Sequence, residues 1–339
     1  MATAADHLEE YREILAPYER SSPGRSVWQI ANSFIPFIGL WYLMYRSLAL
    51  PYWGTLLLAI PTAGFLIRIF IIQHDCGHGS FFDSRKANDL VGRLCSVFSL
   101  TPYAYWRRFH AAHHATSGKL DHRGEFDIPT LTVREYRAHS RWGRMKYRLA
   151  RHPLVLFGIG STIHFVARQR SPAIAPRTWR RERRSIVLTD LAIGATIAAL
   201  AWLIGLWALV RVQAPLTVVA STVGLWLFYV QHQFEDTYWE RHDLWTFASA
   251  GMEGSSYYKL PAVLQWFTGN IGLHHIHHLS VKIPNYRLPQ CLAENPPLQR
   301  LRPLTLLASF RCASLKLWDE DRRKLVRFRD VDLTPARKS

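Results

Sequence analysis

Apolar residues gather in four runs along this chain, each long enough to be considered as a membrane span. A helix needs about 20 mostly apolar residues to cross the hydrocarbon core of a bilayer. Arg46 and Arg68 are basic residues near the ends of the first two runs. We predict four transmembrane helices, at residues 26–50, 52–72, 186–210 and 215–230.

Two shorter apolar stretches, 90–106 and 153–167, contain polar residues or proline. Each is too short to span the bilayer comfortably, so we predict interfacial or re-entrant helices. Sequence patterns typical of strands are sparse. The rest of the chain is therefore predicted to be mostly helical and to form a large cap outside the membrane.

The distribution of basic residues predicts the orientation in the membrane. The connection between the second and third spans is long, and its residues 134–184 contain thirteen Arg and one Lys against two Glu. The other two connections between spans are short. Because cytoplasmic loops carry an excess of Lys and Arg, we expect this segment, both termini and the cap to be cytoplasmic.

The whole chain is strongly basic, with 42 Lys and Arg against 25 Asp and Glu, a net charge of +17. No nucleic-acid recognition motif accompanies this charge, so nucleic acid is not an expected partner. The basic loop instead suits anionic lipid headgroups or an acidic electron donor. The four cysteines are far apart in the sequence and are expected to be reduced thiols.

Nine histidines occur at spacings that suit metal ligands. Residues three and four apart lie on one face of a helix, so each box can direct its imidazoles at one point. Neutral imidazole is the commonest side-chain metal ligand, and nine imidazoles exceed what a single ion uses. The pattern therefore predicts a two-metal site. The candidates are the pair His74 and His78, the triplet His110, His113 and His114, the single His232, and the triplet His274, His277 and His278, in which His275 could replace His274.

The donor set favours iron. Zinc prefers four ligands and often includes thiolates, whereas this set is large and almost purely imidazole. No Glu has a His three residues later, as in soluble di-iron bundles, and no His-Glu-x-x-His box of zinc proteases is present. A histidine-rich, membrane-embedded di-iron oxygenase remains.

The boxes, taken together and in this order, resemble those of the membrane fatty acid desaturase superfamily, and most closely those of bacterial and plastid-type acyl-lipid desaturases. The similarity extends over residues 71–289 and includes the four-span pattern. The strings that carry it are His74-Asp75-Cys76-Gly77-His78, His110-Ala111-Ala112-His113-His114, Gln231-His232-Gln233-Phe234-Glu235-Asp236 and His274-His275-Ile276-His277-His278.

The resemblance implies an all-α integral membrane enzyme with four transmembrane helices and a cytoplasmic helical cap that holds two iron ions, with the nine histidines as ligands. Such an enzyme uses O2 and two electrons to introduce a cis double bond into an acyl chain, here expected to belong to a glycerolipid. The electrons would come from an external donor, a ferredoxin or a b-type cytochrome. The desaturase domain would cover 26–289, between a cytoplasmic N-terminal segment 1–25 and a cytoplasmic tail 290–339, in a bacterial inner membrane.

Two further sets of residues are weaker candidates. Acidic residues beside the ligands can orient imidazoles through the second ring nitrogen, although ordinary ion pairs in the cap would explain them equally well. Aromatic residues near the boxes can line an acyl tunnel, although packing within the cap is an equal explanation. The first set is Asp75, Glu235 and Asp236, with His275 beside them; the second is Tyr103, Trp106, Trp239, Trp266 and Phe267.

Two alternative functions remain at this stage. A fatty acid or carotenoid hydroxylase or ketolase would use the same di-iron scaffold, and only its products would distinguish it. A metal transporter would place ionisable residues across the bilayer midplane, and the predicted spans are nearly free of them.

Overall fold

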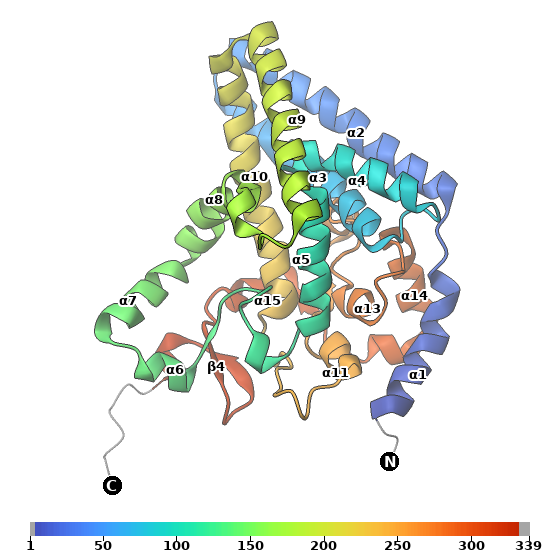
Figure 1. The fold of residues 1–339 in the computed structure, drawn as a ribbon, viewed down its shortest axis with the longest axis vertical. Coiled ribbons are helices and arrows are strands. Elements are labelled where there is room, and N and C mark those ends of the chain that lie inside the picture. Colours follow the sequence, from blue (N-terminus) through green and yellow to red (C-terminus); the bar gives the residue numbers. More distant parts are fainter. Residues whose placement is uncertain (1–3, 332–339) are drawn as a thin grey trace.

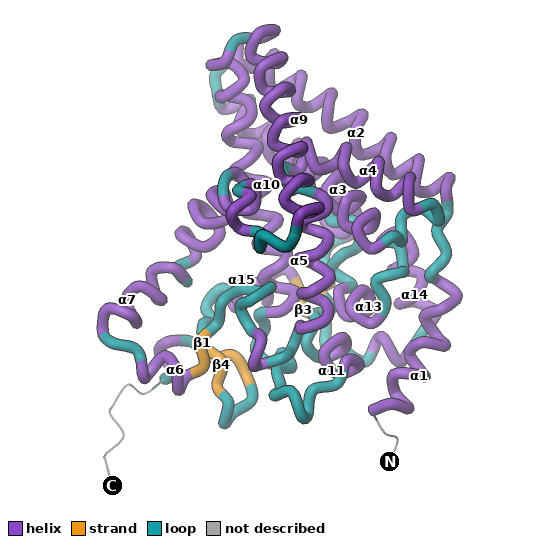
Figure 2. The backbone as a smooth tube through the Cα atoms, viewed as in Figure 1, coloured by secondary structure: helices purple, strands orange, loops and turns teal. Residues whose placement is uncertain are grey.

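The computed structural model describes residues 4–331, which form a mostly helical chain with two very small sheets (Figures 1 and 2). The prediction of a mostly helical chain is confirmed. The α-helices are α1 (Ala4–Leu15), α2 (Pro23–Arg46), α3 (Trp53–His78), α4 (Arg85–Ser99), α5 (Tyr103–Thr116), α6 (Val133–Ala138), α7 (Arg141–Ala150), α8 (Ser161–Val166), α9 (Arg180–Ile204), α10 (Leu206–His232), α11 (Phe247–Met252), α12 (Ala262–Phe267), α13 (His274–Leu279), α14 (Leu288–Glu294) and α15 (Leu306–Cys312).

Short strands and turns complete the cap. The strands are β1 (Leu131–Thr132), β2 (Tyr258–Lys259), β3 (Leu304–Thr305), β4 (Leu317–Asp319) and β5 (Lys324–Val326). A π-helical segment covers Leu154–Gly160. Short 3-10 turns cover Ala16–Tyr18, Ser47–Ala49, Leu120–His122, Arg168–Arg170, Pro172–Ile174, Asn285–Arg287, Pro296–Gln299 and Phe328–Asp330.

Within residues 4–331, four helices are long and apolar enough to cross a membrane: α2 with the turn that follows it, α3, α9 and α10. Much of their apolar surface faces outward, as Trp28, Leu57 and Trp202 illustrate. A surface of this kind is stable only against other apolar groups, such as lipid acyl chains. The four predicted transmembrane segments are therefore confirmed as long apolar helices.

The connection between the last two of these helices differs from the sequence prediction. Helix α9 ends at Ile204, and Gly205, with a φ of 84°, makes the turn into α10. A glycine adopts this backbone conformation readily because it has no Cβ. The predicted connection at 211–214 lies inside α10, which also contains Pro215. The sequence suggested a break there, but a transmembrane helix tolerates an internal proline.

The two predicted surface stretches also form differently. The stretch 90–106 is divided between α4 and α5 at Leu100, whose φ is 56°. The stretch 153–167 forms the π-helical segment followed by α8.

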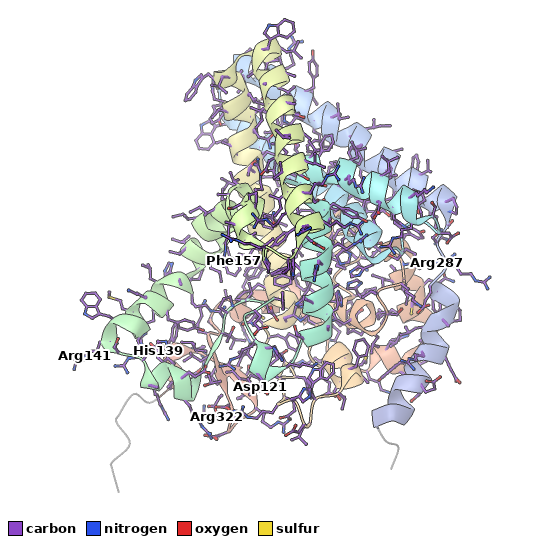
Figure 3. The ribbon with its side chains drawn as sticks, in the orientation of Figure 1. Asp121, His139, Arg141, Phe157, Arg287 and Arg322 are labelled. Carbon is purple, nitrogen blue, oxygen red and sulfur yellow. The ribbon has the colours of Figure 1, made fainter. Side chains whose placement is uncertain are left out.

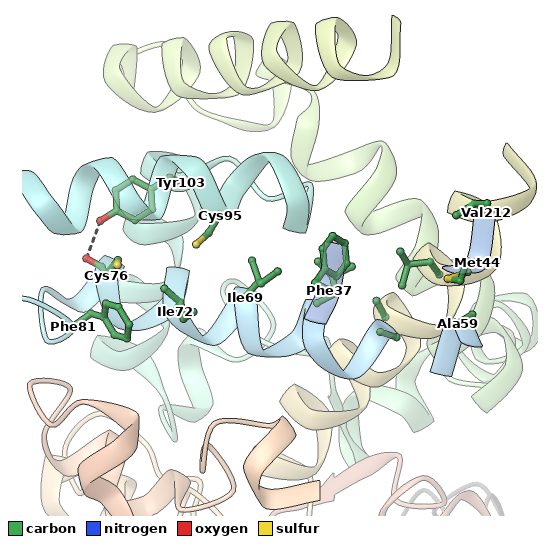
Figure 4. Close-up of a cluster of buried hydrophobic side chains, with 14 residues drawn as sticks. Phe37, Met44, Ala59, Ile69, Ile72, Cys76, Phe81, Cys95, Tyr103 and Val212 are labelled. Carbon is green, nitrogen blue, oxygen red and sulfur yellow. Dashed lines mark hydrogen bonds between the residues drawn. The ribbon is translucent and has the colours of Figure 1, made fainter. Parts of the chain in front are cut away.

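Helix α3 is the central helix of the membrane part and packs against α2, α4 and α10. Its buried side chains, among them Ile69 and Ile72, form one hydrophobic cluster with Phe37 and Cys95 of neighbouring helices (Figure 4). The helix has 26 residues, a length of about 39 Å at 1.5 Å per residue. This exceeds the roughly 30 Å of the hydrocarbon core, so its last turn extends toward the cap.

The cap lies at one end of the long helices (Figure 1). Its two sheets tie together segments that are distant in sequence: β1 pairs in parallel with β4, which pairs with β5, and β2 pairs in parallel with β3. The pairing of β2 with β3 holds the chain on either side of α12, α13 and α14. The cap thereby places α13 below the ends of α3 and α10.

The packing of α4 on α5 leads to a test of the fold. A Cβ added at Gly92 would overlap the ring of Tyr103, and that ring is fully buried, with its hydroxyl donating to the Cys76 carbonyl at 2.8 Å (Figure 4). We expect Gly92→Ala to destabilise the protein by about 1–3 kcal/mol, seen as a lower Tm in detergent. Gly194→Ala in α9 is the control, because a Cβ there meets nothing within 4 Å. Equal Tm values for the two variants would contradict this packing.

Candidate metal centre

Four helices bring the nine predicted histidines together in two groups at the cap ends of α3 and α10. Within each group, one potential ligand atom from every histidine lies within 4.8 Å of all the others. Helix α3 supplies two of the nine, α5 and α13 supply three each, and α10 supplies one. The five-histidine cluster consists of His74, His78, His110, His114 and His277; the four-histidine cluster consists of His113, His232, His274 and His278.

Each three-histidine box contributes to both clusters. In α5, the i, i+4 pair His110 and His114 belongs to the five-histidine cluster and His113 to the other. In α13 the assignment is reversed: the i, i+4 pair His274 and His278 belongs to the four-histidine cluster, and His277 belongs to the five-histidine cluster. Residues four apart lie nearly above one another on a helix, and the residue between them is rotated to one side. Helices α5 and α13 therefore each bridge the two clusters.

The distances between ring nitrogens fit shared ions. In the four-histidine cluster, Nε2 of His232 lies 3.0 Å from Nε2 of His113 and 3.0 Å from Nε2 of His274. In the five-histidine cluster, Nε2 of His114 lies 3.1 Å from Nε2 of His277. Two nitrogen donors at right angles on one ion, with bonds of about 2.1 Å, lie about 3 Å apart. The imidazoles are thus spaced as donors around an ion are.

The buried nitrogens also fit a cation chemically. Nε2 of His74 and Nε2 of His78 are buried without a hydrogen-bond partner, a state that costs free energy unless something binds them. Burial, together with neighbouring histidines, lowers the pKa of His110, His277 and the other cap histidines of both clusters well below the ordinary value. The neutral imidazole is the form that binds metal. Both clusters can therefore hold a metal ion.

Hydrogen bonds fix the orientation of His74. Its Nδ1 donates to Oδ1 of Asp75 at 3.0 Å, which leaves Nε2 to face the cluster. Oδ2 of Asp75 accepts from the backbone N and from Nδ2 of Asn285, at 2.7 and 2.8 Å. The Asn285 amide exchanges two hydrogen bonds with the amide of Gln29 in α2. A buried chain of four side chains thus runs from the first membrane helix to a ring of the cluster.

Nδ1 of His232 does not bond to Glu235 or Asp236, the acidic residues that follow it in the sequence. It donates to the carbonyl oxygen of Gly254 at 3.0 Å. Glu235 instead pairs with Lys324 at 3.1 Å on the surface, and Asp236 is also exposed. The reason is that α10 ends at His232, so the residues after it leave the helix and turn outward.

His275 lies beside the clusters in sequence but belongs to neither. Its Nε2 bonds to the Leu298 carbonyl at 3.1 Å, and burial lowers its pKa to about 4. The direction of the two rings favours His274 over His275 as a ligand: Nε2 of His274 faces His232, whereas Nε2 of His275 faces the Leu298 carbonyl.

Among the aromatic candidates, Trp106 lies against the histidine rings. It stacks on His110 with ring centroids 4.6 Å apart and an interplanar angle of 19°, and it also lies beside His74 and Phe70. Phe228, which the sequence did not single out, lies 5.1 Å from His113 between ring centroids. Phe70 precedes His74 in α3 by one helical turn, and Phe228 precedes His232 in α10 by one helical turn. These side chains therefore border the clusters on the side of the membrane helices.

The other aromatic candidates pack elsewhere. Tyr103 fills the space between α3, α4 and α5. Trp239 packs against Trp318 in the cap, with ring centroids 5.3 Å apart. Trp266 covers the buried Arg68 guanidinium at 3.7 Å from its ring centroid, and Phe267 packs on Gly64 of α3. Their contacts are those of ordinary packing.

Sequence reasoning missed Gln29, Asn285, Gly254 and Phe228. Gln29 and Asn285 are 256 residues apart, and no spacing pattern connects such a pair. Asn285 had a faint signal, because it follows Pro284 in a loop soon after the third box.

Comparison with known proteins gives the family. The sequence pattern of the fatty acid desaturase family matches residues 47–305. A protein named fatty acid desaturase from Bacillus subtilis is 44% identical over 98% of this chain and 94% of its own length. The sn-1 oleoyl-lipid 12-desaturase of Synechocystis sp. is 27% identical over 75% of this chain and 70% of its own length. An sn-1 acyl-lipid omega-3 desaturase (ferredoxin) of Synechocystis sp. is 26% identical over 68% and 64%.

The chain therefore belongs to the fatty acid desaturase family. It is an oxidoreductase and a membrane protein, and its two histidine clusters can hold metal.

Helix α13 offers a matched pair of variants for the metal assignment. We expect His277→Ala to lower the metal content of the purified protein sharply, because it removes a donor that faces His114. His275→Gln should keep the metal, since its ring faces Leu298 and the glutamine amide can donate to the same carbonyl. Metal is measured by plasma mass spectrometry on folded, monodisperse protein. Retained metal in His277→Ala would contradict the assignment.

The hydrogen-bond chain to His74 gives a further prediction. Asp75→Asn keeps the size of the side chain but turns an NH2 donor toward either Nδ1–H of His74 or the two N–H donors of Asn285. The orientation of His74 is then weakened, so metal affinity should fall about 10- to 100-fold. Competition with a chelator measures this affinity. Glu235→Gln is the control, because that carboxylate pairs with Lys324 on the surface. If the two variants bind metal equally well, Asp75 does not orient the ligand.

Proposed function

We propose that this protein introduces a cis double bond into an acyl chain of a membrane glycerolipid, with O2 and two electrons from an external donor, at two iron ions. The observation that carries the proposal is the convergence of nine imidazoles into two adjacent clusters at the cap ends of the membrane helices. The rings of His114 and His278, one from each cluster, have centroids only 4.1 Å apart. Two ions held there would be neighbours.

The donors support iron over other metals. Imidazole suits iron, zinc, copper and nickel, but a cluster of five imidazoles exceeds the four ligands that zinc prefers. Cys76, which lies between His74 and His78 in the sequence, belongs to the hydrophobic cluster between α3 and α4 instead (Figure 4). Iron with nitrogen ligands and open positions supplies the activation of O2 needed to break an unactivated C–H bond.

The reaction balances with two electrons from outside the chain. O2 takes up four electrons and four protons to give two water molecules. Two electrons and two protons come from the adjacent methylenes, which become the double bond, and two of each come from the donor and the solvent. The clustered histidines would hold the ions, while Asp75 and the Gly254 carbonyl orient the rings of His74 and His232.

The substrate is proposed to arrive from the bilayer. Phe70 and Phe228 each lie one helical turn on the membrane side of a clustered histidine, in α3 and α10, and Trp106 packs beside Phe70. An acyl chain that follows this apolar route reaches the clusters without crossing water. The two Synechocystis relatives are named as desaturases of lipid-bound acyl groups. These names support a glycerolipid substrate.

The donor and the location are part of the same proposal. One relative's name specifies ferredoxin, which supports ferredoxin over a b-type cytochrome. The basic segment 134–184 and the positive-inside rule support a cytoplasmic cap in a bacterial inner membrane. The even number of spans would then place both termini in the cytoplasm.

Product analysis tests the reaction. A bacterial host expressing this chain with a ferredoxin and its reductase should accumulate a cis-unsaturated acyl chain, located by gas chromatography–mass spectrometry of fatty acid derivatives. The His277→Ala variant, expressed at the same level in the membrane, should lack that product. A hydroxylated or keto product would mean that the protein catalyses another oxidation instead of desaturation. An unchanged lipid profile, with iron-loaded protein and active ferredoxin present, would contradict the proposal.

A further inference from the structure

One histidine of the two clusters differs from the other eight in its exposure. His78 is partly exposed, whereas the remaining eight are buried. Its Nε2 atom is nevertheless buried, so the nitrogen faces the cluster while another part of the residue reaches the surface. His78 ends α3, and Gly79, with a φ of 78°, turns the chain away. The protein thus covers the five-histidine cluster least at this point.

His78 lines a surface cleft of about 460 Å³, together with its small neighbours Gly77 and Gly79. Its walls come from the end of α3 and from α4, α5 and the first turn of α9. The residues that carry charge are Arg85, Arg107, Arg108 and Arg181 with Asp83, Asp89 and Glu182.

Carboxylates hold most of these arginines in place. Arg107 pairs with Asp89 at 2.9 Å, and Arg181 approaches the same carboxylate at 3.5 Å. Arg108 pairs with Glu182 at 3.3 Å. About half of each outer side chain is still exposed, 49% for Arg108 and 55% for Arg181. The cleft therefore presents ordered guanidinium groups to solvent, beside further arginines in the first turn of α9.

The polar walls do not suit an acyl chain, and the route proposed for that chain enters from the bilayer. The cleft has four arginines against three carboxylates, and the further arginines in the first turn of α9 add to this positive excess. It therefore suits a partner with a carboxylate-rich surface that needs to approach the five-histidine cluster. Electron transfer weakens steeply with distance, so an electron carrier must dock where a cluster ligand lies nearest to the surface. Complementary charge guides and orients such encounters.

We propose that this cleft is the docking site of the electron donor, a small acidic ferredoxin, and that electrons enter through His78. The inference rests on the proposed desaturase reaction. Each docking oxidises one reduced ferredoxin by one electron and reduces the metal cluster by one electron, so two dockings supply the pair that each turnover needs. The docking site is thus on α4, α5 and α9, and not on the more remote basic helix α7.

The chain offers a matched control for this site. Arg85 begins α4 and Arg141 begins α7; both are exposed, and both follow a serine whose side chain caps the helix. Figure 3 labels Arg141 on the outlying helix α7. A glutamate at either position is compatible with folding, because acidic side chains are favourable at a helix N-terminus. Arg85→Glu and Arg141→Glu therefore make the same charge change at equivalent backbone positions.

The measurement is the Kd of oxidised plant-type ferredoxin, which cannot transfer an electron during the titration, for iron-loaded protein in lipid nanodiscs, determined by calorimetry at low and moderate salt. We expect Arg85→Glu to weaken binding about tenfold at low salt, with a smaller salt dependence than wild type, while Arg141→Glu stays close to wild type. Arg181→Glu is a second variant within the cleft and should behave as Arg85→Glu does. The KM for ferredoxin should rise in parallel, with reduction by dithionite unchanged.

Three results would overturn the docking site. Equal weakening by Arg85→Glu and Arg141→Glu would mean that only the overall charge matters. Unchanged ferredoxin binding in both cleft variants would place the donor elsewhere. If the cleft variants change how product formation depends on phosphatidylglycerol content while ferredoxin binding is unchanged, the cleft binds a lipid headgroup instead. Product formation by wild type is scored separately, so a wrong docking site is distinguishable from a wrong reaction.

Discussion

The structure depends on one constraint, the need to satisfy a group of neutral imidazole nitrogens brought together inside the protein. Buried polar atoms without partners cost about 1–3 kcal/mol each. Nε2 of His74 and Nε2 of His78 have no protein partner, and several other Nε2 atoms have only one another. Cations bound in the two clusters would satisfy all of them at once. Because the clustered histidines come from four separate helices, metal binding would then be linked to assembly of the cap.

This constraint explains the arrangement of the elements around it. Helices α3 and α10 continue to the membrane surface and deliver His78 and His232 as their last residues. Helices α5 and α13 come from the cap and each bridge the two clusters. The two small sheets hold the long loops that carry these helices. Membrane helices supply a rigid frame and an apolar approach, and the cap closes the site from the other side.

The sequence was sufficient for the parts of the site that follow from local geometry. Spacings of three and four residues on helices predicted eight of the nine clustered histidines, the family resemblance added His232, and long apolar runs predicted the four long helices. The division of the histidines between the two clusters could not be predicted from the sequence, because it depends on how α5 and α13 are rotated relative to one another. The partners of His74 and His232 were only partly predictable: Asp75 is adjacent, but Asn285 and Gly254 come from distant loops. Glu235 was misleading because proximity in sequence says little beyond the end of a helix.

The central claim is that two neighbouring ions are held by nine histidines, and the metal content of the purified wild-type protein tests it most directly. Plasma mass spectrometry combined with Mössbauer spectroscopy gives both the identity and the coupling of the metal. We expect about two irons per chain, one for each cluster, with the spectroscopic signature of a coupled pair. A single ion per chain, or zinc in place of iron in active protein, would contradict it.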